Sequence, residues 1–100
     1  MGHRHERIRR KATVNQVHLA IEAFYNDYGK YPEDLKELDG ENEREKVYFE
    51  GVEQIAEKYD IYFEVDRDND GFVETDEGKF QQKLAVWIYY KKDMIKSWRD

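Results

Sequence analysis

The segment "KATVNQVHLAIEAFYNDYGKYPEDLKEL", residues 11–38, decides the fold because it carries a strong helical pattern and a clear end to it. Its apolar residues recur at spacings of three and four, which places them on one side of an α-helix. We therefore expect a helix over residues 7–28 whose apolar side packs on the rest of the chain. That side consists of Val14, Val17, Ile21, Phe24, Tyr25 and Tyr28.

The residues after this helix predict a turn and then shorter helices. Gly29 is placed to end the long helix with a positive φ. Pro32 suits the first turn of a short helix over residues 32–38, and two acidic residues follow it, near the positive end of the helix dipole. A third helix is expected over residues 43–58, although "KVYFEGV", residues 46–52, could also form a strand.

Beyond residue 60 the apolar spacing changes from helical to alternating. "DIYFEV", residues 60–65, and "KLAVWIYYKK", residues 83–92, are rich in β-branched and aromatic residues, which is typical of strands. Shorter strands at "GFVE" and "MIKSW" would complete an antiparallel meander over residues 60–99.

The predicted fold class is therefore α+β, with a long N-terminal α-helix packed against a C-terminal antiparallel β-sheet. It forms a single domain over residues 7–100. Residues 1–6, "MGHRHE", are interpreted as an expression tag or a disordered start.

The composition describes an acidic chain with a basic start. The net charge is −6 at pH 7, yet basic residues gather in the first eleven positions, at Arg4, Arg7, Arg9, Arg10 and Lys11. An acidic body argues against nucleic-acid binding, which needs a basic face. A regulator that uses the basic start on nucleic acid is the alternative with the least support in the sequence.

The sequence lacks the residues that several kinds of catalytic site require. The chain contains no cysteine, which excludes thiol catalysis, disulfides and cysteine zinc sites. Ser97 has no histidine near it in sequence, so a serine triad has no support. His18 is interpreted as a residue of the helix surface, and Trp87 and Trp98 as core or sheet residues. We expect no enzymatic activity.

The stretch "DRDNDGFVETDE", residues 66–77, matches the spacing of a twelve-residue calcium loop. Calcium prefers six to eight oxygen ligands at fixed places in such a loop, with a glycine at the sixth place. Gly71 stands there. The expected ligands are Asp66, Asp68, Asp70, the backbone carbonyl of Phe72, Glu74 and Glu77. A plain acidic turn is the alternative, because Asp, Asn and Gly favour turns.

The flanking residues favour a calcium loop between strands over an EF-hand. An EF-hand needs a helix on each side, whereas the residues before this loop alternate as a strand and Gly78 follows it. We expect the ion to stabilise the sheet region. Residues 80–92 also have apolar residues at helical spacing, so an EF-hand-like module that binds a partner protein stays open as the alternative function.

The helix ending "AIEAFYNDYGKYP", residues 20–32, together with the helix before it and the short helix after it, resembles the type IV pilin and type II secretion pseudopilin family. The resemblance implies a structural subunit of a bacterial type IV pilus or type II secretion pseudopilus. It implies a helix packed on an antiparallel sheet, and calcium held by loops of the sheet region is also known in that family.

The resemblance also implies where the protein acts and with what. Its partners would be identical or related subunits in a helical filament, with no role for nucleic acid. Family members are anchored in the inner membrane by an apolar extension of the helix, with the remaining domain in the periplasm or in a cell-surface filament. No run here approaches the roughly 20 apolar residues that span a bilayer, so that extension would precede this sequence.

Overall fold

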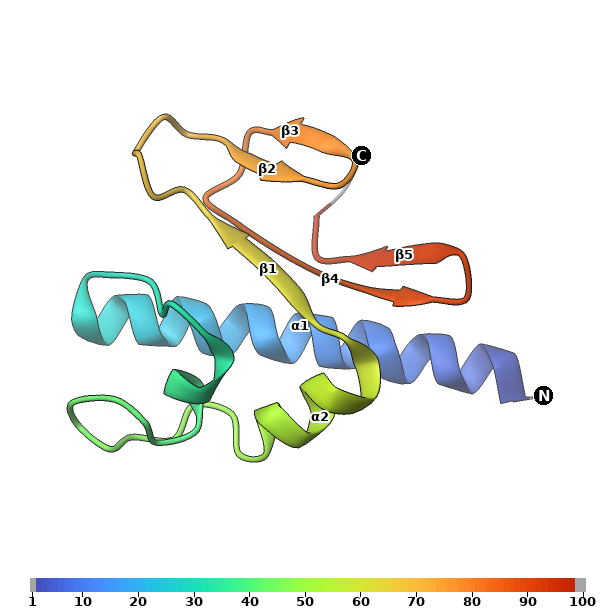
Figure 1. Ribbon diagram of the computed structural model, residues 1–100, viewed down its shortest axis with the longest axis horizontal. Coiled ribbons are helices and arrows are strands. Elements are labelled where there is room, and N and C mark those ends of the chain that lie inside the picture. Colours follow the sequence, from blue (N-terminus) through green and yellow to red (C-terminus); the bar gives the residue numbers. More distant parts are fainter. Residues whose placement is uncertain (1, 99–100) are drawn as a thin grey trace.

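The computed structural model describes the backbone of residues 2–98 and the side chains of residues 7–98. One long helix is followed by short helices and then by five strands (Figure 1). The elements in chain order are α1 (Gly2–Tyr28), η1 (Leu35–Leu38), α2 (Val52–Tyr59), β1 (Tyr62–Val65), β2 (Val73–Thr75), β3 (Gly78–Phe80), β4 (Leu84–Tyr90) and β5 (Asp93–Lys96).

Helix α1 confirms the expected long helix and begins earlier than expected. The helix includes residues 2–6, which were expected to be a tag or a disordered start. The helix can extend over these residues because the arginines and the alanine within residues 4–12 favour helix and no proline interrupts them. The helix ends at Tyr28, and the next residue, Gly29, has a φ of 71° and donates its N–H to the carbonyl of Tyr25 at 2.7 Å.

The strands form two sheets instead of one meander. A three-stranded antiparallel sheet has the order β1-β4-β5, with Tyr62 opposite Trp87 and Trp87 opposite Lys96. Strands β2 and β3 pair only with each other and form a separate hairpin, with Val73 opposite Phe80. The α+β class with an antiparallel sheet is confirmed, whereas the single sheet over residues 60–99 is wrong.

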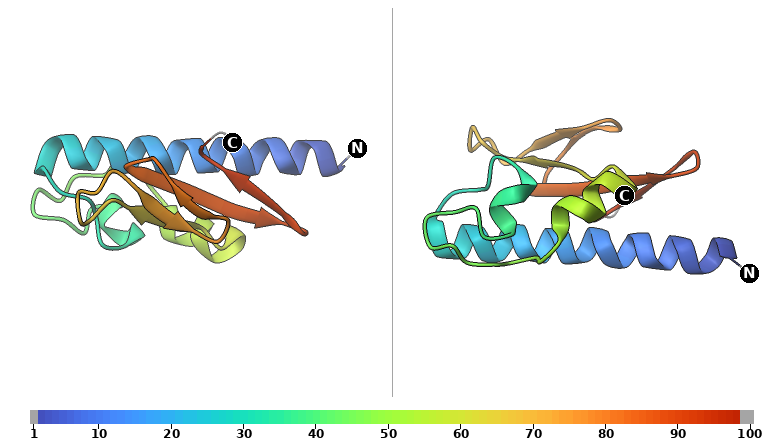
Figure 2. Two further views of the ribbon diagram at one scale, coloured as in Figure 1. Left: turned by 90° about the horizontal axis from the view of Figure 1, so that it is seen from above. Right: turned by 60° about the horizontal axis from the view of Figure 1, so that its bottom comes forward.

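The position of β4 explains this arrangement. Figure 1 and the right view in Figure 2 place the three-stranded sheet between α1 on one side and the β2–β3 hairpin on the other. The first five residues of β4 are all buried. A strand covered on both faces reads as a continuous apolar run, and "LAVWI" is such a run.

The main core lies between α1 and the sheet. Val14, Val17, Ile21 and Phe24 are almost fully buried there, whereas Tyr25 is 41% exposed. Burying each large apolar side chain contributes roughly 1.5–3 kcal/mol. A second core lies on the other face of the sheet under the hairpin, and it contains Trp87 and Trp98, as expected from the sequence.

The helix predicted over residues 43–58 forms only as α2, from Val52. Before it, the side chain of Asn42 donates to the carbonyls of Glu37 at 2.7 Å and Lys46 at 2.8 Å. Such side-chain bonds to the backbone compete with a helix. Gly51 then takes a φ of 76°. The helix predicted over residues 32–38 is shorter as well, a single 3-10 turn, η1.

Among the described residues, no helix combines the length and the apolar character needed to cross a lipid bilayer.

Candidate metal centre

The acidic loop connects two strands that belong to different sheets. It leaves β1 after Val65 and enters β2 at Val73, so strands and not helices flank it. Two contacts fix its first residues to the body of the protein. The N–H of Asp66 donates to the carbonyl of Lys83 at 2.9 Å, and the guanidinium of Arg67 donates to the carbonyl of Pro32 at 3.4 Å.

Three of the predicted ligands lie together in this loop. One carboxylate oxygen each from Asp66, Asp68 and Asp70 lies within 4.8 Å of the other two, which is close enough to hold a metal ion. Asp66 is buried, with 8% of its surface exposed, while the other two side chains lie in solvent. Carboxylate oxygens suit hard cations such as Ca²⁺ and Mg²⁺.

Backbone N–H groups hold these carboxylates in place. Asp66 accepts hydrogen bonds from the N–H of Asp70 at 3.1 Å and of Gly71 at 2.8 Å. Asp70 in turn accepts the N–H of Phe72 at 2.9 Å. The loop can curl in this way because Asn69 and Gly71 adopt positive φ angles of 60° and 84°, a conformation that Asn and Gly tolerate well.

The carboxylates perturb one another. A side-chain hydrogen bond with Asp66 raises the pKa of Asp68, and desolvation adds to the shift. The pKa of Asp70 is lowered, first by the N–H of Phe72 and also by the charge of Lys79, whose Nζ lies 3.7 Å from the carboxylate of Asp70. A divalent cation among the three groups would replace their mutual repulsion by coordination.

The structure places the two predicted glutamate ligands in the hairpin and not in this cluster. Glu74 lies in β2 opposite Lys79 and is exposed. Glu77 lies in the turn between β2 and β3, where its carboxylate is 2.9 Å from Nζ of Lys96. The turn is fixed by the hydroxyl of Thr75, which accepts the N–H of Glu77. A strand thus carries the ninth and twelfth loop positions away from the first three.

Phe72 differs from the glutamates because its expected ligand is a backbone carbonyl. Its N–H is bonded to Asp70, so its peptide lies beside the cluster, and its side chain is 40% exposed. The nearby cations Arg67 and Lys79 were not expected from the sequence. Nothing in their spacing signals the contacts, which depend on the Pro32 corner and on the β2–β3 register.

Histidine does not contribute to this centre. Nδ1 of His18 lies 3.1 Å from a carboxylate oxygen of Glu22, one turn further along α1. His18 is half-buried and lies outside the aspartate cluster, so the centre offers oxygen ligands alone among the residues that the structure describes.

Comparison with known proteins finds no matching family model, no similar curated protein and no similar solved structure.

Proposed function

We propose that this chain is a non-enzymatic structural subunit of a bacterial type IV pilus or type II secretion pseudopilus, stabilised by a calcium ion at Asp66, Asp68 and Asp70. The observation that carries the proposal is the two-sided character of α1. One side is buried under the sheet, while the opposite side exposes Leu19 by 65% and Ile8 by 59%.

The exposed side of α1 forms a stripe suited to contacts with neighbouring subunits. Ile8, Ala12, Leu19 and Ala23 recur at helical spacing, and all four are exposed. A groove of about 330 Å³ runs beside the last two, and Tyr48 and Phe49 form its other wall. Exposed apolar surface of this kind marks interaction sites, and small residues let helices approach closely.

The neighbours in this proposal are identical or related subunits in a helical filament. An apolar segment preceding these residues would anchor the subunit in the inner membrane, and the domain would lie in the periplasm or in a surface filament. The acidic body of the chain gives nucleic acid no role. The subunit would catalyse no reaction, and the hydroxyl of Ser97 accepts the N–H of Val86.

The calcium ion would act as a clamp between the two sheets. The loop joins β1 of the three-stranded sheet to β2 of the hairpin, so an ion that fixes the loop fixes one sheet on the other. An EF-hand sensor works differently, by changing the angle between two flanking helices. The flanking strands therefore favour the clamp over the EF-hand-like alternative.

Immunogold electron microscopy tests the filament function directly. Antibodies against residues 1–100 should label filaments along their length in bacteria that produce the protein from its complete gene. Cells in which Leu19→Asp places a charge on the exposed stripe should make folded protein and few or no labelled filaments. Labelling confined to dispersed particles in the unaltered strain, with filaments unlabelled, would contradict the proposal.

A further inference from the structure

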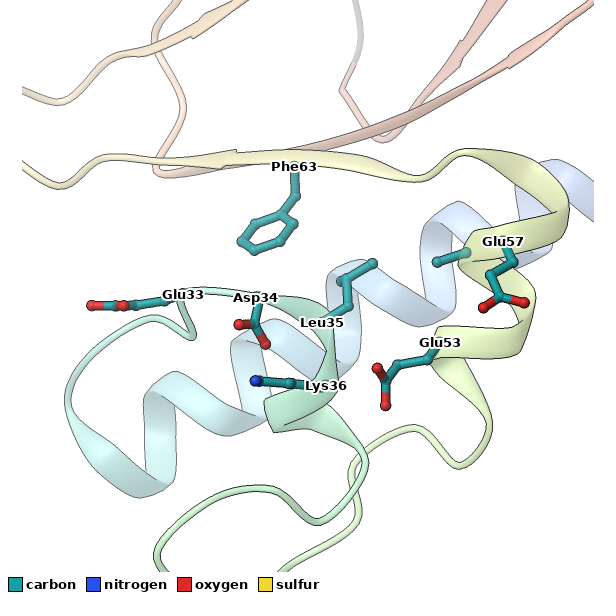
Figure 3. Close-up of a pocket in the computed structure, with 8 residues that line it drawn as sticks. Glu33, Asp34, Leu35, Lys36, Glu53, Glu57 and Phe63 are labelled. Atoms are coloured by element: carbon teal, nitrogen blue, oxygen red, sulfur yellow. The ribbon is translucent and has the colours of Figure 1, made fainter.

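An open groove of about 440 Å³ lies between η1 and α2, apart from the aspartate cluster (Figure 3). Its floor is apolar and consists of side chains from three elements, Leu35 of η1, Ala56 of α2 and Phe63 of β1. All three are only half-buried. The volume lies within the range of roughly 300–1,000 Å³ that is typical of ligand pockets.

The rim of this groove is acidic. Glu53 and Glu57 stand on the α2 side, and Asp34 stands across from them at the start of η1, with Glu33 further out (Figure 3). None of these four carboxylates forms an ion pair with any residue that the structure describes. Lys36 is the one basic residue of the lining. An apolar floor under net negative charge suits an apolar side chain flanked by cations.

The chain itself carries a segment of that chemistry at the start of α1. The first turns of the helix extend past the turn between β4 and β5 (Figure 1). Ile8 follows Arg7, which pairs with Asp93 at that turn. Ile8 is 59% exposed and is flanked in sequence by Arg7 and Arg9. Arg9 is exposed and forms no ion pair within the described residues, and Arg7 makes only a solvent-exposed pair with Asp93 at 3.4 Å.

The neighbouring arginine, Arg10, has a different role. Its guanidinium carbon lies 4.6 Å from the ring centre of Tyr59 and 4.4 Å from that of Tyr90. These two contacts keep Arg10 on its own chain. The segment available to a second molecule is therefore Arg7 to Arg9, with Ile8 at its centre.

A molecule cannot place this segment in its own groove. Helix α1 is continuous from Gly2 to Tyr28, so its first turns cannot bend back to the groove. We infer that the groove between η1 and α2 receives the Arg7–Arg9 segment of a second copy of this chain, with Ile8 on the apolar floor and arginines at the carboxylate rim. The inference rests on the proposed function, because it assigns one contact between neighbouring subunits.

This contact is heterologous, because it joins two different surfaces of the chain. Each bound copy therefore still offers a free groove at one end and a free Arg7–Arg9 segment at the other. Contacts of this head-to-tail kind propagate into open assemblies when the rotation does not close a ring. That property agrees with a filament.

Disulfide trapping can test the contact without background from native cysteines, because the chain has none. An Ile8→Cys variant labelled with ¹⁵N is mixed with an unlabelled Ala56→Cys variant and oxidised. Mass spectrometry then measures the mixed dimer. The matched control replaces Ala56→Cys by Glu43→Cys, an exposed position outside the groove. The groove pair should give about tenfold more mixed dimer than the control pair. Equal yields would overturn the inference.

A second experiment reverses the charges at the groove and then restores complementarity by reversing those of the partner chain. Adding Glu53→Lys and Glu57→Lys to the Ala56→Cys chain should reduce the mixed dimer about tenfold, to the level of the control. Adding Arg7→Glu and Arg9→Glu to the partner chain should restore it, which a merely structural effect of either change would not do. Unchanged yield on reversal would count against the electrostatic contact even if the trapping succeeds.

These results and those of the filament test can be told apart. Labelled filaments with equal trapping yields would leave the filament function standing and remove this contact from it. Specific trapping with no labelled filament would keep the contact between copies and remove the filament function.

Discussion

Oδ2 of Asp66 accepts the backbone N–H of Gly71 at 2.8 Å, so the first residue of the acidic loop holds the residue at which the loop turns. The other oxygen of Asp66 accepts the N–H of Asp70 at 3.1 Å. Asp66, which is buried, shapes the loop in this way, and it also lies close enough to Asp68 and Asp70 to hold a metal ion with them. Asp68, which is exposed, offers mainly a ligand.

Substitutions at Asp66 and Asp68 should separate these two roles. Asp66→Ala leaves the N–H of Gly71 without an acceptor, and it leaves the N–H of Asp70 only its longer bond of 3.4 Å to Asp68. It should lower the free energy of unfolding by about 1–3 kcal/mol even without calcium. Asp68→Asn should change the calcium-free stability by less than about 0.5 kcal/mol, yet weaken calcium binding. Urea denaturation with EGTA measures the first effect and calorimetric titration the second. Equal losses of calcium-free stability in both variants would contradict this division.

The position of Glu77 gives a test between this loop and an EF-hand. Its carboxylate pairs with Lys96 at 2.9 Å and lies outside the aspartate cluster. Glu77→Gln should therefore leave the calcium affinity nearly unchanged and cost at most about 1 kcal/mol of stability. Asp70→Asn is the matched comparison and should weaken binding clearly. A loss of affinity in Glu77→Gln as large as in Asp70→Asn would show that Glu77 moves to the ion.

The contact of Asp27 in α1 with Lys46 and Tyr48, in the segment before α2, should be sensitive to acid. Hydrogen bonds from Lys46 at 2.8 Å and Tyr48 at 2.6 Å lower the pKa of Asp27 below its ordinary value of 3.8. A carboxyl group with a lowered pKa contributes stability above its unfolded pKa, and this contribution is lost as the pH falls through the folded pKa.

Urea denaturation between pH 6 and pH 2 measures this contribution. The native protein should lose more stability below about pH 4 than Asp27→Asn, which lacks the titrating group. Lys46 and Tyr48 remain in that variant, so the comparison isolates the carboxylate. Parallel stability curves over this pH range would show that the contact contributes nothing.

Two neighbouring arginines should differ in their effect on stability. Arg10 lies between the rings of Tyr59 and Tyr90, so Arg10→Gln should cost about 1–2 kcal/mol through lost cation–π and packing contacts. Arg9 is exposed, and Arg9→Gln should leave the stability within about 0.5 kcal/mol. Thermal unfolding of the two variants at one protein concentration makes the comparison. Similar melting temperatures for both would contradict the assigned stacking.

The parts of the fold that local patterns determine could be predicted from the sequence. The spacing of Val14, Val17, Ile21 and Phe24 predicted the buried side of α1, since helical periodicity alone defines it. The aspartates at residues 66, 68 and 70 are so close in sequence that one turn brings them together. The helix over residues 43–58 failed because bonds from the side chain of Asn42 outweigh a weak helical pattern.

The remaining features depend on contacts between distant residues. Glu77 was expected at the ion because it stands at the twelfth position of the loop, whereas pairing of β2 with β3 carries it to Lys96. The groove between η1 and α2 has a floor drawn from three elements, so no local pattern signals it. The separate hairpin follows from the burial of β4 on both faces. The continuous apolar run "LAVWI" is the sequence signal of that burial, but it was interpreted as an alternating strand.

Thermal unfolding with and without calcium tests the central claim, an ion-bound clamp between two strands, most directly. At a calcium concentration about 100 times the dissociation constant, binding should add about 2.7 kcal/mol of stability. For a chain of this size that raises Tm by roughly 10 °C or more over the value in EGTA. The Asp68→Asn/Asp70→Asn double variant should show no such rise. The same Tm with calcium and with EGTA in the unaltered protein would contradict the account.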